Sequence, residues 1–104
     1  MTPWPVLFSR LPQLVEKLEA IAHPLLTVEV DGEAVARLVR PSRAELEAHA
    51  RRAGMPTLTP EGWLREALGR VRDYYPEPRE QVALYAGSQP VAVLRRRGVV
   101  GHAA

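Results

Sequence analysis

The stretch TVEVDGEAVARLVR, residues 27–40, decides the fold of this 104-residue chain. Apolar and polar residues alternate on both sides of Asp31-Gly32, and this dipeptide favours the tight turn that right-twisted strands require. The stretch therefore predicts a β-hairpin with strands at 25–30 and 34–39.

The register of this hairpin stays open between two turn lengths. A two-residue turn places Arg37 opposite Leu26, whereas a three-residue turn places Ala36 and Leu38 on the same face as Leu26. The sequence favours neither.

A similar stretch, YAGSQPVAVLRRR, follows at residues 85–97 and predicts a second hairpin with strands at 81–86 and 90–95. Gly32 aligns with Gly87 at an offset of 55, and Val35-Ala36 aligns with Val91-Ala92 at an offset of 56. The alignment implies one extra residue in the second turn. It is explained either by repetition of a helix-plus-hairpin unit or by chance similarity between two apolar hairpins, and both explanations stay open.

Three amphipathic helices complete the pattern, at residues 9–22, 42–54 and 59–75. We expect Ser9, Ser42 and Thr59 to cap them, with Glu45 completing a capping box. The apolar stripe of the third helix consists of Trp63, Leu64, Ala67, Leu68, Val71 and Tyr75.

These elements predict the α+β class, as two helix-plus-β-hairpin units (α-ββ-α-α-ββ) that share one core, with an internal pseudo-repeat as one interpretation. At this length we expect a single domain over residues 1–104. Its half-units would be 1–54 and 55–98, followed by a loose tail at 99–104.

The second hairpin is apolar on both of its alternating faces, so we expect both faces to be covered. Simple alternation places Val82, Leu84, Val91 and Val93 on one face, and Ala83, Tyr85, Ala92 and Leu94 on the other. Either more of this chain or a second copy of it would supply the cover, and the second copy is favoured. This predicts a homodimer whose interface residues are Val82, Leu84, Tyr85, Val91, Val93 and Leu94.

The bulk composition is that of an ordinary globular protein, with 46% hydrophobic and 25% charged residues and a net charge of +2. No apolar run approaches the ~20 residues that span a bilayer, the stretch MTPWPVLFSR lacks the basic and apolar pattern of a signal peptide, and cysteine is absent. We therefore expect a cytoplasmic location and no membrane partner. Abundant proline and arginine fit either a thermophile or a GC-rich genome, and favour the thermophile.

No catalytic or metal-binding pattern is present, so the sequence predicts no enzyme, no cofactor and no metal site. His23, His49 and His102 stand alone rather than at metal-ligand spacing. The serines lie at helix starts or in a turn, and the glycines are too scattered for a phosphate-binding loop.

Residues 8–41, FSRLPQLVEKLEAIAHPLLTVEVDGEAVARLVRP, resemble the antitoxins of the Phd/YefM family. The similarity lies in a serine that opens an amphipathic helix, a proline-led strand, a glycine turn, the strand Ala34–Leu38 and a helix from Ser42. The resemblance implies a homodimeric α+β domain that binds operator DNA and a partner toxin. The phosphate contacts that it implies are Arg10, Arg37, Arg40 and Arg43.

Arg95 and Arg97 would lie on one face of the last strand and are further candidates for DNA binding. Arginines at a strand end also prevent edge-to-edge aggregation, which is an equally good explanation. Two functional hypotheses follow. The chain is an antitoxin-like repressor, or it is a protein-interaction and oligomerisation module that uses the same fold without DNA.

Overall fold

The computed structural model describes residues 2–96, which form four helices and four strands. In chain order they are α1 (Trp4–Ser9), α2 (Leu11–Ile21), β1 (Leu25–Val30), β2 (Glu33–Val39), α3 (Arg43–Arg52), α4 (Pro60–Tyr74), β3 (Gln81–Ala86) and β4 (Gln89–Arg95).

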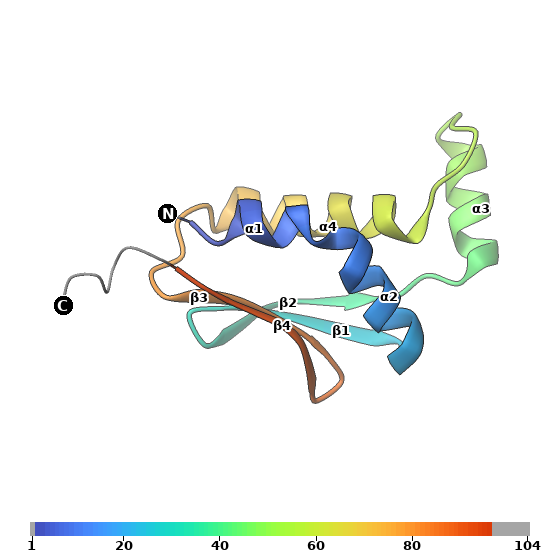
Figure 1. Cartoon of the computed structure of the whole chain (residues 1–104). Helices are drawn as coiled ribbons and strands as arrows, with labels where there is room; N and C mark the ends of the chain where they lie inside the picture. Colours follow the sequence, from blue (N-terminus) through green and yellow to red (C-terminus); the bar gives the residue numbers. More distant parts are fainter. Residues whose placement is uncertain (1, 97–104) are drawn as a thin grey trace, which may run out of the picture.

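The two hairpins join in one antiparallel sheet of order β2-β1-β3-β4, with β1 beside β3 at its centre. Helices α1, α2 and α4 lie on one side of this sheet, and α3 projects from its end (Figure 1). The predicted α+β class is confirmed. The predicted tail at 99–104 lies outside the described residues.

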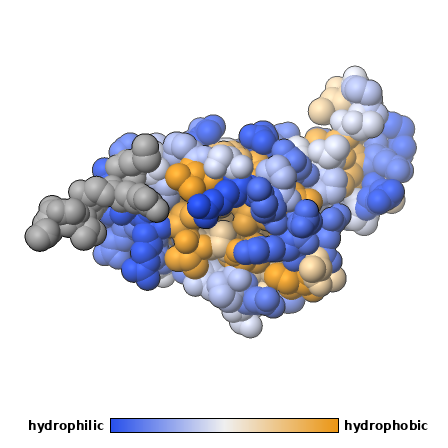
Figure 2. Space-filling model, in the orientation of Figure 1, coloured by the Kyte–Doolittle hydropathy of each residue, from blue (hydrophilic) through white to orange (hydrophobic). Residues whose placement is uncertain are grey.

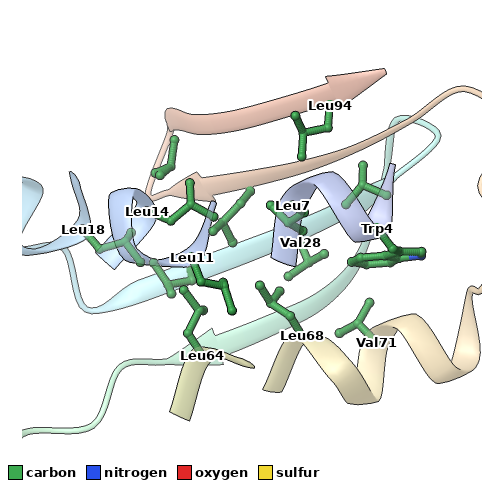
Figure 3. Close-up of a cluster of buried hydrophobic side chains, with 14 of the residues drawn as sticks. Trp4, Leu7, Leu11, Leu14, Leu18, Val28, Leu64, Leu68, Val71 and Leu94 are labelled. Carbon is green, nitrogen blue, oxygen red and sulfur yellow. The ribbon is translucent and has the colours of Figure 1, made fainter. Parts of the chain in front are cut away.

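The core fills the space between these helices and one face of the sheet (Figure 3). Its largest member, Trp4, is 1% exposed, and its indole Nε1 donates a hydrogen bond of 2.7 Å to the Tyr75 carbonyl at the end of α4. Burial of each large apolar side chain contributes about 1.5 to 3 kcal/mol. The buried core residues are Trp4, Leu7, Leu11, Leu14, Leu18, Leu64, Leu68 and Val71 from helices, and Leu26, Val28, Val30, Val82, Leu84, Ala86, Val91 and Leu94 from strands.

The register of the first hairpin combines both sequence alternatives. The turn has two residues, Asp31 and Gly32, and both have the positive φ that this tight turn requires. Within β2, which follows this turn, Val35 is an extra residue without a partner in β1, and it forms a β-bulge. The bulge shifts the pairing so that Leu38 lies opposite Leu26, as the three-residue turn predicted.

The second hairpin repeats this construction. Its turn, Gly87-Ser88, also has two residues, and Val91 is the extra residue of its bulge. The predicted extra turn residue is therefore wrong, because the two hairpins have the same length and Gly87 occupies the position of Asp31 rather than that of Gly32. The Lys17 ammonium from α2 donates to the Val91 carbonyl at the bulge, at 3.4 Å.

The helix starts are partly as predicted. Ser42 and Glu45 form the expected capping box, and the Thr59 hydroxyl accepts from the Gly62 N–H. Ser9 does not cap a helix: it ends α1, an element the sequence did not predict, and its hydroxyl donates to the Val6 carbonyl. Tyr75, placed in the buried stripe of α4, is 43% exposed.

Asp31 joins the first hairpin to the segment that leads into β3. Its carboxylate accepts backbone hydrogen bonds from Arg79, Glu80 and Gln81 at 2.9, 2.6 and 3.1 Å, and its own N–H donates to the Gln81 carbonyl at 2.9 Å. Partial burial raises the pKa of Asp31, but the three N–H donors and the Arg79 charge outweigh it and hold the pKa below its ordinary value.

Replacement of Asp31 by Asn should lower the free energy of unfolding by about 1 to 2 kcal/mol, because charge-assisted hydrogen bonds are lost while the turn geometry is kept. A lowered carboxyl pKa stabilises the fold above about pH 4, and this contribution is lost as the pH falls through the folded-state pKa. Urea unfolding at several pH values should therefore show the two proteins converging in acid. Asp73→Asn, at an exposed helix position, is the control, and an equal loss in both variants would contradict the prediction.

Gly87 lies directly against His23 at the opposite end of the central strands. The His23 Nδ1 atom accepts from the Leu25 N–H at 3.1 Å, and a Cβ added to Gly87 would come within 2.8 Å of the imidazole. Gly32 occupies the related turn with the same sign of φ, but a Cβ there would meet no atom within 4 Å.

This pair of glycines separates backbone strain from steric conflict. Gly32→Ala should cost about 1 to 2 kcal/mol of stability from the left-handed backbone alone. Gly87→Ala should cost about 1 kcal/mol more, since the imidazole must move and release the Leu25 N–H. Thermal unfolding of both variants measures the difference, and equal costs would show that the His23 contact has no energetic weight.

Candidate interaction surface

The face of the sheet opposite the helices is uncovered among the described residues, and we call it the open face. Strand alternation and the pairing register of the strands assign its residues. Two rows cross its centre, each with one residue per strand in the order β2, β1, β3, β4. The first row is Arg37, Thr27, Tyr85 and Pro90, and the second row is Ala34, Glu29, Ala83 and Val93.

The structure changes the predicted composition of this surface. Four of the six predicted interface residues, Val82, Leu84, Val91 and Leu94, belong to the core of their own chain. Only Tyr85 and Val93 lie on the open face, where Val93 is 43% exposed.

The bulge at Val91 is the reason for this difference. Simple alternation placed Val91 with Val93, but the extra residue reverses the alternation, so that Val91, Ala92 and Leu94 all face the helices. The hairpin therefore needs less external cover than predicted. Ala83 is 1% exposed although no helix covers it, because its neighbours on the same face shield so short a side chain.

Glu29 is the open-face residue that the sequence interpretation did not consider. It lies beside Ala83 in the second row, and alternation from the buried Leu26, Val28 and Val30 was the signal that could have placed it. Neither Glu29 nor Arg37 forms an ion pair or a side-chain hydrogen bond with another residue of the described range 2–96. The two central rows of the open face thus carry one acid and one base without partners, and a further arginine, Arg95, lies beside Gln81 at the margin of this face.

The two outer strands offer little for the addition of another strand. The Arg40 N–H bonds to the Pro24 carbonyl, and the Arg96 N–H bonds to that of Glu80, which fixes the hydrogen-bonded pairs of each hairpin. On the C-terminal side of each bulge, only two residues of each outer strand then direct their peptide groups outward. They are Arg37 and Val39 in β2, and Val93 and Arg95 in β4. Bulged, short edges of this kind disfavour sheet extension.

The arginines proposed for DNA binding fall into two groups on opposite edges of the sheet. Arg37, Arg40 and Arg43 lie at the end of β2 and the start of α3, whereas Arg10 and Arg95 line one cleft of about 570 Å³ beside β4. Arg97 lies outside the described residues.

Arg40 has a structural function within the fold. Its Nη1 atom donates to the carbonyls of Leu18 and His23, at 2.7 and 3.3 Å, and so holds the C-terminal end of α2. It is half-buried, unlike the exposed Arg37 and Arg43. Two arginines on the β2–α3 side therefore remain free to meet a phosphate.

Two further clefts lie beside the helices and mix charged with apolar residues. A cleft of about 630 Å³ between α1 and α4 is lined by Trp4, Phe8, Arg65, Arg72 and a single acid, Asp73, with the Arg72 guanidinium 4.9 Å from the Phe8 ring centre. A second, of about 500 Å³ beside α3, mixes Arg43 and Arg51 with Glu19 and Glu47.

The outside of α3 is mainly hydrophilic in the view of Figure 2, which does not indicate an apolar docking surface there. Within residues 2–96, no three acidic or histidine side chains come together as a metal site, and no helix has the length and apolar character to cross a membrane.

Comparison with known proteins found no family model, no curated relative and no solved structure that matches this chain.

Proposed function

We propose that this chain is a small interaction module that forms a homodimer through the open face of its sheet. The observation that supports this proposal most directly is that helices cover only one of the two faces of the sheet. One face of the sheet is covered by three helices, while the other presents Tyr85, Val93 and Val39 to solvent, the last of them 72% exposed. Apolar side chains gathered on one sheet face are typical of a contact surface.

The edges support the same interpretation. A partner cannot readily extend a sheet whose outer strands are both bulged, and Pro90 removes a further hydrogen-bond donor from β4. Face-to-face packing of two sheets needs no edge hydrogen bonds, because the inner side chains make the contact.

Sedimentation velocity over a concentration series tests the proposal directly, and a single monomeric species at every concentration would remove it. Val93→Arg should raise the dimer dissociation constant by about tenfold or more, because a charge would have to be desolvated against apolar neighbours. Met55→Arg is the matched control: Met55 is also 43% exposed, but it lies on the loop after α3. If both substitutions had the same effect, another surface would be responsible.

The resemblance to Phd/YefM antitoxins supplies a second proposal, a repressor that binds operator DNA and a partner toxin. What favours it is the exposed pair Arg37 and Arg43 where β2 leads into α3. Contacts of this kind position a protein on phosphates without reading bases. Co-purification with a protein encoded beside it would support the toxin partner.

Filter binding of a labelled duplex at about 50 and about 200 mM salt tests the DNA proposal, since each neutralised phosphate steepens the salt dependence. Arg37→Gln with Arg43→Gln should weaken binding and reduce the slope, whereas Arg10→Gln with Arg95→Gln, on the opposite edge, should leave both unchanged. Absence of binding at the lower salt concentration would exclude DNA as a partner.

Two expectations from composition belong to the same proposals. The absence of cysteine agrees with a cytoplasmic location, and the proline and arginine content favours a thermophile over a GC-rich genome alone. Both stay predictions.

A further inference from the structure

Resting on the proposed homodimer, we infer that two copies pack with their twofold axis across the strands, so that Arg37 of each chain pairs with Glu29 of the other. The inference comes from how charge is distributed over the two central rows of the open face. Both charged residues lie on β1 and β2, which form the charged half. The side chains on β3 and β4, which form the apolar half, are Ala83, Tyr85, Pro90 and Val93.

Two aligned sheets can be related by a twofold axis in two simple ways. An axis parallel to the strands places β2 over β4 and β1 over β3 of the other copy. Arg37 then faces Pro90, and Glu29 faces Ala83. The charged half would lie against the apolar half, and both charges would lose water without gaining a partner, which is strongly unfavourable.

An axis across the strands exchanges the first row with the second row on the same strand. Tyr85 then faces Ala83 and Pro90 faces Val93, so the apolar half meets the apolar half. In the charged half, Arg37 faces Ala34 of the other copy. Glu29 of that copy lies on the next strand, so it is displaced sideways from Arg37 by one strand spacing, about 4.8 Å. Sheets that pack face to face are about 10 Å apart, a gap that an arginine and a glutamate side chain can bridge together. Of the two arrangements, only this one gives both charges of the central rows, Arg37 and Glu29, an opposite charge.

The size of the surface indicates how much this pairing matters. Four strands of up to seven residues make a face of roughly 450 Å², which is small beside the ~800 Å² that each partner buries in a standard interface. The dimer should therefore be weak and reversible. In such an interface, a complementary or a like-charge contact decides whether two copies associate.

Exchange of the two charges tests the arrangement. Glu29→Arg alone leaves two arginines facing two arginines, and Arg37→Glu alone leaves two glutamates facing two glutamates, so each variant should be largely monomeric. In an equimolar mixture the first variant supplies only arginines and the second only glutamates. We expect the mixed dimer to form at least about tenfold more tightly than either variant with itself, by sedimentation equilibrium with one variant carrying a fluorescent label.

The outcomes separate this inference from the proposed function. If the unaltered protein is monomeric at all concentrations, the homodimer itself is wrong. If the unaltered protein dimerises but the mixture shows no preference for the mixed dimer, the homodimer stands and the Arg37–Glu29 pairing is overturned. Circular dichroism of each variant shows whether it folds. A double variant, Glu29→Arg with Arg37→Glu, should dimerise as the unaltered protein does, and its failure to do so would also count against the pairing.

Discussion

The antiparallel contact between β1 and β3 is the interaction on which the rest of the structure depends. A lone two-stranded hairpin is marginally stable in water, and each hairpin here has only one side that helices can cover. Joined through β1 and β3, the two hairpins make a four-stranded sheet with one continuous apolar face. The join is closed at both ends by backbone hydrogen bonds, from Asp31 to Gln81 and from Gly87 to Leu25. Because these two bonds occupy equivalent positions, the centre of the sheet has approximate twofold symmetry.

The symmetry extends to the segments that enter and leave each hairpin. At an offset of 56 residues, β1 and β2 (Leu25–Val30 and Glu33–Val39) correspond to β3 and β4 (Gln81–Ala86 and Gln89–Arg95). Arg40 and Arg96 are equivalent, and each guanidinium donates to a carbonyl in the connection before the first strand of its hairpin. The chemistry at the two turns nevertheless differs. The Asp31 carboxylate satisfies three N–H groups at one end; at the other, Gly87 has no side chain and His23 accepts the Leu25 N–H instead.

The order of the elements and most of their bounds could be predicted from local signals, because Asp31-Gly32, Ser42 with Glu45, and Thr59 act on their own neighbours. The faces of β4 could not. A bulge leaves no local composition signal, and Val91 lies in an unbroken run in which every residue suits a strand. The short helix α1 was missed because its six residues are too few to show a helical periodicity, and Ser9, which ends it, was interpreted as the cap of the next helix. The uncovered face, in turn, depends on how the two hairpins pair, which no single segment specifies.

Comparison of the two hairpins shows where the symmetry stops. Core positions keep their character at the offset of 56, as Val28 and Leu84 or Leu38 and Leu94 do, because both must pack under the same layer of helices. Positions on the open face do not. In the two central rows, Glu29 corresponds to Tyr85 and Arg37 corresponds to Val93, so there the first hairpin is charged where the second is apolar. A face that only had to remain in contact with water would not need this division, since polar residues would serve equally well on both hairpins. Because its two halves differ, the open face is asymmetric. An asymmetric surface can distinguish one docking orientation from another.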